Sequence, residues 1–118
     1  MNKVRLAKLA DFLETVPEDK FNMNVWANLF NYRSKLGDCG TAGCALGWAT
    51  KIFPELELRW DGGSPYILLS STSAGGLQAA NTFFEIDISV SKDIFMAESY
   101  HSFPITPQQV AAKIRSYL

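Results

Sequence analysis

Residues 38–50 read DCGTAGCALGWAT, and this stretch decides the fold. Two cysteines, three glycines and a tryptophan fall within thirteen positions that carry a single charge. Thr41 is a predicted N-cap for a helix that ends before Pro54, and Gly43 and Gly47 would leave one strip of it open to a close neighbour. Apolar residues occupy nearly every side of this helix, which is typical of a helix surrounded by protein. We therefore expect a buried central helix over about residues 41–53.

The composition predicts one globular domain over residues 1–118. Hydrophobic residues make up 47% of the 118 residues and charged residues 19%, which is unlike a disordered chain. Eleven basic and twelve acidic side chains leave a formal net charge of −1, so we expect no extended nucleic-acid surface. No apolar run is long enough to span a membrane, and charges interrupt the opening stretch MNKVRLAKLADFLETV, which is unlike a signal peptide. We therefore expect a cytoplasmic protein, in a bacterial cell or an infected host, with reduced cysteines.

Helical periodicity predicts further helices on both sides of the central one. Apolar residues recur at steps of three and four in five segments, which cover about residues 3–16, 23–36, 77–86, 90–96 and 107–118. The predicted N-caps of the second, fourth and fifth segments are Asn22, Ser89 and Thr106. Gln109 completes a capping box with Thr106, and Gly37 supplies the stop of the second segment.

A single β-hairpin is predicted after Pro54. The segment LELRW alternates apolar and charged residues, the turn DGGSP follows, and YILLS supplies a second apolar run. Alternation on both sides of a glycine turn is typical of a hairpin, here over about residues 56–70. The expected fold class is α+β and mainly α-helical, with one small hairpin beside a buried central helix.

Two segments resemble a known family. FNMNVW (residues 21–26) and CGTAGCALGWA (residues 39–49) are similar to the signature F-x-M-x-x-W … C-G-T-x-x-C-x-x-G-W-A of small uncharacterised bacterial and bacteriophage proteins. Asn22 stands where that family usually has Asp, which keeps the capping role. The resemblance implies a phage or bacterial accessory protein, such as an anti-defence factor, and it assigns no activity.

The glycine-rich segment before the central helix is a candidate anion site. Its backbone N–H groups would meet the positive end of the helix, where a phosphate is favoured. The segment lacks the Gly-Lys-Ser/Thr of a P-loop. The predicted ligand-binding residues for an anionic small molecule such as a nucleotide are Arg33, Lys35, Cys39, Gly40, Thr41, Gly43 and Cys44. The same glycines are also consistent with a tight turn beneath neighbouring helices, so both interpretations stay open.

Two other classes of function compete with small-molecule capture. Trp60 and Tyr66 flank the hairpin turn, where exposed aromatics would anchor a host protein and inhibit it. As an enzyme, the chain would be a cysteine hydrolase with Cys39 as nucleophile and His101, its sole histidine, as base. Either Asp93 or Glu98 would then orient the imidazole.

The leading prediction is a non-enzymatic binding protein without a cofactor. Cys39 and Cys44 would need both His101 and Asp38 to reach the four protein ligands typical of a structural zinc site, so no metal site is predicted. The sequence leaves the oligomeric state open.

Overall fold

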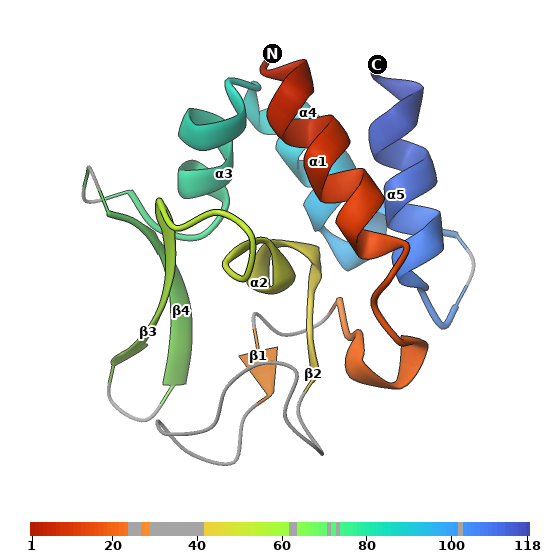
Figure 1. The fold of residues 1–118 in the computed structure, drawn as a ribbon, viewed down its shortest axis with the longest axis horizontal. Helices are drawn as coiled ribbons and strands as arrows, with labels where there is room; N and C mark the ends of the chain where they lie inside the picture. Colours follow the sequence, from red (N-terminus) through yellow and green to blue (C-terminus); the bar gives the residue numbers. More distant parts are fainter. Residues whose placement is uncertain (24–26, 29–41, 62–63, 71, 73, 102) are drawn as a thin grey trace.

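A computed structural model describes residues 1–23, 27–28, 42–61, 64–70, 72, 74–101 and 103–118. Figure 1 shows α1, α4 and α5 packed together, the β3–β4 hairpin on the other side of the molecule, and α2 between them. The elements in chain order are α1 (Lys3–Leu13), η1 (Glu18–Lys20), β1 (Ala27–Asn28), β2 (Ala42–Gly43), α2 (Ala45–Ala49), β3 (Leu56–Asp61), β4 (Ser64–Leu69), α3 (Leu77–Phe84), α4 (Ile88–Phe95), η2 (Ala97–Ser99) and α5 (Pro107–Ser116). The predicted fold class, α+β and mainly helical, is confirmed.

The first and last helices form as the sequence predicts and pack against each other. The apolar stripe of the first segment is buried, namely Leu6, Leu9, Leu13 and Val16. The guanidinium group of Arg115 on α5 joins two carboxylates near the end of α1, Asp11 at 2.7 Å and Glu14 at 2.5 Å. Figure 1 shows both chain termini at the same end of the molecule.

Side-chain caps fix the starts of the later helices. The capping box of α5 is confirmed, because Thr106 Oγ1 accepts from Gln109 N and Gln109 Oε1 accepts from Thr106 N, each at 3.1 Å. The predicted cap of α4 is wrong by two residues. Asp87, not Ser89, caps this helix, and its Oδ1 accepts from Val90 N at 3.1 Å and from the Ser89 hydroxyl at 2.6 Å. A carboxylate oxygen can accept two hydrogen bonds, so Asp87 caps the helix and also binds the Ser89 hydroxyl.

The central helix is buried as predicted, but it is much shorter than about residues 41–53. All five residues of α2 are buried. The chain before it is extended, because Ala42 and Gly43 form β2 and pair antiparallel with β1. Cys44 is therefore the N-cap in place of the predicted Thr41, and its Sγ accepts from Gly47 N at 3.4 Å. Since Gly43 lies in a strand, it does not share a helical strip with Gly47.

The prediction of a helix over residues 23–36 is wrong where the structure describes it. Residues 27 and 28 are extended as β1, with Ala27 opposite Gly43 and Asn28 opposite Ala42. Residues 24–26 and 29–36 lie outside the described residues, and so do the predicted stop at Gly37 and the side chain of Trp26. Pairing with β2, a contact distant in sequence, overrides the local helical pattern here.

Aromatic side chains fill the core between α2, the hairpin and the later helices. The rings of Phe53, Phe83 and Phe84 meet edge to face, with centroids 4.9 to 5.8 Å apart. Trp48 on α2 is buried, and its indole N–H donates to the carbonyl oxygen of Lys20 at 3.0 Å. This bond satisfies the polar atom of a buried tryptophan and joins α2 to η1.

The predicted hairpin is confirmed as β3 and β4. These strands pair antiparallel from Leu56 opposite Leu69 to Asp61 opposite Ser64. Alternate residues face the core, and the buried or core-packed ones are Leu56, Leu58, Ile67 and Leu69. The opposite face, which we call the outer face, carries Glu57, Arg59, Tyr66 and Leu68.

Candidate functional site

The structure describes only part of the anion site predicted at the start of α2. Of the seven predicted ligand-binding residues, the structure describes Gly43 and Cys44. Gly43 pairs with Ala27 in β2, and Cys44 is 2% exposed. The other five, Arg33, Lys35, Cys39, Gly40 and Thr41, lie outside the described residues. The described part of the segment is thus a strand residue paired with β1, followed by a buried cysteine.

The thiol of Cys44 is suited to packing and not to nucleophilic attack. Burial raises its pKa from an ordinary 9.0 to about 11, although backbone N–H groups of the helix start act in the opposite direction. At neutral pH the group is therefore a neutral thiol, and a thiolate is the reactive form. Cys44 acts as the cap of α2 and as a small apolar side chain of the core.

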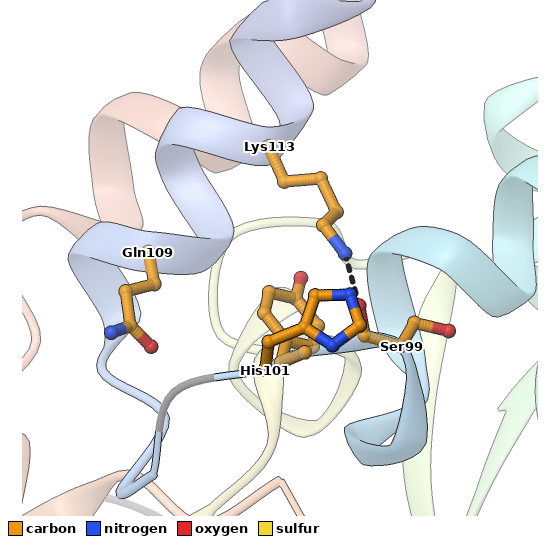
Figure 2. Close-up of a pocket in the computed structure, with 5 residues that line it drawn as sticks. Ser99, His101, Gln109 and Lys113 are labelled. Carbon is orange, nitrogen blue, oxygen red and sulfur yellow. Dashed lines mark hydrogen bonds between the residues drawn. The ribbon is translucent and has the colours of Figure 1, made fainter.

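His101 lines an open pocket of about 270 Å³ between η2 and α5. Figure 2 shows its imidazole below the Lys113 side chain and beside Gln109, and these two residues are one turn apart on α5. The other lining residues are Ser99 and Tyr100. His101 is exposed. The predicted nucleophile Cys39 lies outside the described residues, so the proposed Cys39–His101 pair stays a prediction.

Lys113, the cation of this pocket, donates all of its side-chain hydrogen bonds to other groups of the protein. Its Nζ donates to the backbone oxygen of Asp93 at 3.0 Å, to Asp93 Oδ1 at 3.1 Å and to the backbone oxygen of Ser99 at 2.8 Å. The same ammonium group lies 3.8 Å from the centroid of the Tyr100 ring. Because an ammonium group has three N–H donors, all of them are engaged, and an anionic ligand would have to displace one of these bonds.

Asp93 is held in the same way and does not orient His101. Its carboxylate accepts from Lys113 and from the Tyr117 hydroxyl. The Tyr117 hydrogen bond, and then Lys113, lower the pKa of Asp93 below its ordinary 3.8, while partial burial opposes them. The same bond raises the pKa of Tyr117. Asp93, Lys113, Tyr117, Ser99 and Tyr100, which we call the α5 corner, therefore form a structural unit.

The hairpin separates the two aromatics predicted to act together. Trp60 lies opposite Pro65 and Tyr66 lies opposite Arg59, in neighbouring pairs of the ladder. Since neighbouring pairs alternate between faces, these two strand positions belong to opposite faces of the sheet. Tyr66 is half-buried on the outer face. The alternation of faces along a strand already predicts this separation from the sequence. The prediction that Trp60 and Tyr66 act together considered only their closeness to the turn.

Beside Tyr66, the outer face carries an exposed ion pair. Arg59 Nη2 lies 2.6 Å from Glu57 Oε2, and Arg59 Nε donates to the same oxygen at 2.7 Å. The side chains are 54% exposed for Arg59 and 36% for Glu57. An ion pair this exposed contributes little to stability, so both charges are available to a partner at small cost.

Among the described residues, one edge of the hairpin has no strand partner. Ser70 N–H donates to the Glu55 carbonyl oxygen at 2.9 Å, which makes residues 55 and 70 a hydrogen-bonded pair. Hydrogen-bonded and non-bonded pairs alternate along an antiparallel ladder. The odd-numbered positions of β3 therefore bond to β4, and the N–H and C=O groups of Leu58 and Trp60 point to the outer edge.

The two edges of the hairpin differ. On the β4 side, the Ile67 carbonyl oxygen accepts from Gly76 N at 3.0 Å, and Leu69 N donates to the Ala74 carbonyl oxygen at 2.9 Å. Among the described residues, no strand pairs with β3 on its other side. The outer edge of β3 is therefore a row of backbone donors and acceptors without a strand partner in the described chain.

No family model matches the chain, and neither a curated protein nor a solved structure matches it. Within the described residues, no group of three or more His, Cys, Asp or Glu side chains is placed to hold a metal ion. No helix in that same part of the chain combines the length and apolarity needed to cross a membrane.

Proposed function

We propose that this chain is a non-enzymatic binding protein that holds another protein through the β3–β4 hairpin. The single observation that carries the proposal is the open edge of β3. Backbone N–H and C=O groups at a sheet edge are a template for an incoming strand, and addition of a strand is a recurrent mode of protein recognition.

The outer face next to this edge would supply specificity. Tyr66 is half-buried opposite Arg59, which is exposed. Tyrosine and arginine are enriched among the residues that dominate binding energy at protein interfaces. The α5 corner offers less, because Lys113 also donates to two backbone oxygens of other elements and is much less exposed than Arg59. The outer face of the hairpin thus carries exposed charges that are bonded only within their own strand.

The other two interpretations remain predictions with less support. Capture of a nucleotide-like anion now depends on residues 33–41, because Gly43 and Cys44 are built into the fold. A cysteine hydrolase depends on Cys39 and on an orienting group for His101 other than Asp93. The resemblance to bacterial and bacteriophage proteins favours an accessory or anti-defence role, in which capture of a host protein would inhibit it.

The test compares two aromatic substitutions in the immobilised chain. We expect Tyr66→Ala to lose a protein captured from bacterial lysate and Phe103→Ala to retain it. Phe103 is 69% exposed and belongs to the segment between η2 and α5. Figure 1 shows this segment on the side of the molecule opposite the hairpin. Equal capture by both variants would contradict a role for the hairpin. A rise in melting temperature with a nucleotide would instead favour the anion site, since a ligand at a hundredfold excess over its Kd stabilises by about 2.7 kcal/mol.

A further inference from the structure

We infer that the partner of the β3 edge is a second copy of this chain, paired antiparallel about Leu58. This inference rests on the proposed function of the hairpin and names its partner. It would join two hairpins into a continuous four-stranded sheet in the order β4, β3, β3, β4. Three observations carry it: the direction of the free backbone groups, the order of the charges, and the place of Leu58 at the margin of the core.

The backbone groups at the open edge match a second β3 strand. Leu58 presents both N–H and C=O outward, so a twofold axis at this residue gives two reciprocal hydrogen bonds between the two copies of Leu58. Two positions away, Trp60 N–H of each copy meets Leu56 C=O of the other. The Leu56 N–H is already used, because it donates to the Phe53 carbonyl oxygen at 3.0 Å. The pairing therefore completes four backbone hydrogen bonds without breaking any.

The charges on the outer face select this register. With Leu58 opposite Leu58, Glu57 of each copy lies opposite Arg59 of the other, which gives two favourable cross-strand pairs. A register centred on Glu57 would oppose two glutamates, and one centred on Arg59 would oppose two arginines. Like charges directly opposite each other destabilise a ladder. Charged residues often guard a sheet edge against self-pairing, but this pair is complementary to itself.

Leu58 gains most from the pairing on the core-facing side. It is half-buried and packs against the core, whereas its neighbour on the same face, Leu56, is 2% exposed. The second copy of Leu58 would cover the exposed remainder with an apolar side chain. A two-stranded ribbon is marginal by itself, and a sheet of four strands is a more stable unit. An interface of this small size is expected to be weak and to form only at high concentration.

Amide hydrogen exchange measured at several concentrations tests the pairing residue by residue. We expect protection of the Leu58 amide to rise between about 10 µM and about 1 mM, the range of a transient interface, as the sedimentation coefficient rises. The amides of Glu57 and Arg59 are the matched control, because they bond to β4 in either state and should not depend on concentration. A chain that stays monomeric, with a Leu58 amide that exchanges as freely at high as at low concentration, would overturn the inference.

Two charge variants test the register. Glu57→Arg places two arginines on each strand and Arg59→Glu places two glutamates, so each variant alone should self-associate about tenfold or more weakly. Mixed in equal amounts, the two should form a heterodimer at least as tight as the original pair, and the double variant Glu57→Arg/Arg59→Glu should self-associate again. Both side chains are exposed, so unchanged melting temperatures serve as the check on folding.

The outcomes separate this inference from the proposed function. Self-association that is indifferent to these charges, or a mixture without preference for the heterodimer, would overturn the Leu58 register. A strictly monomeric chain that still captures a different protein through Tyr66 would overturn the second copy as partner and leave the hairpin as the binding region. A chain that neither self-associates nor captures another protein through the hairpin would overturn the proposed function as well.

Discussion

The α5 corner and the β3–β4 hairpin both present a cation next to a carboxylate, but the two ion pairs differ in exposure and in the elements that they join. Lys113 is 20% exposed and joins α5 to α4 and η2 through three hydrogen bonds. Arg59 is 54% exposed and bonds to Glu57, two residues away on the same strand. A charge held by several elements thus maintains the fold, whereas a charge held by its own strand is available for recognition.

The largest expected effect is at Lys113. We expect Lys113→Met to lower the free energy of unfolding by about 2 kcal/mol, because it removes charge-assisted hydrogen bonds from two backbone oxygens and one carboxylate. Lys92→Met, the same change at an exposed position of α4, is the control and should stay within about 0.5 kcal/mol. Urea denaturation measures both. If both variants lost the same free energy of unfolding, Lys113 would contribute no more to stability than the exposed Lys92.

An intermediate effect on stability is expected at Asp93, and it should depend on pH. Because the folded state lowers the pKa of Asp93, its carboxylate stabilises the fold above its ordinary pKa of 3.8, and this contribution is lost as the pH falls through the lowered value. Asp93→Asn should therefore be less stable than the original chain at neutral pH, by about 1 kcal/mol for a partly exposed group, and the difference should shrink on acidification. Tyr117→Phe should raise the pKa of Asp93 toward 3.8. A difference that does not vary with pH would contradict this assignment.

The smallest expected effect on stability is at Arg59. Arg59→Ala should change the free energy of unfolding by less than about 0.5 kcal/mol, since its ion pair is exposed. The same variant should weaken self-association measured by sedimentation. A loss of stability as large as that of Lys113→Met would erase the contrast between the two regions and assign Arg59 to the fold.

Elements with local signals could be predicted from the sequence alone. The apolar spacing of Leu6, Leu9 and Leu13 predicts α1, and the capping box of Thr106 and Gln109 predicts α5. The alternation in LELRW and YILLS predicts the hairpin. In each case the decisive residues lie within a few positions of one another, so a single stretch of chain contains the whole signal.

The segment around α2 could not be predicted in the same way. Its apolar residues predict a long helix, but pairing of β1 with β2 keeps Ala42 and Gly43 extended and delays the helix to Ala45. A ladder between residues 27–28 and 42–43 has no local signature. The candidate anion site depended on a helix that begins at Thr41, so the same long-range contact weakens both predictions.

The sequence by itself determined the fold class, the amphipathic helices, the hairpin and the burial of residues 45–49, because apolar spacing and caps act over short distances along the chain. Only the tertiary structure decided which polar groups are hydrogen-bonded within the protein and which stay available. It satisfied Lys113 and Asp93 within the α5 corner and left the outer edge of β3 without a strand partner in the described chain. The physical reason is that hydrogen bonds between distant segments depend on where the segments meet, and that meeting is set by the packing of the whole core.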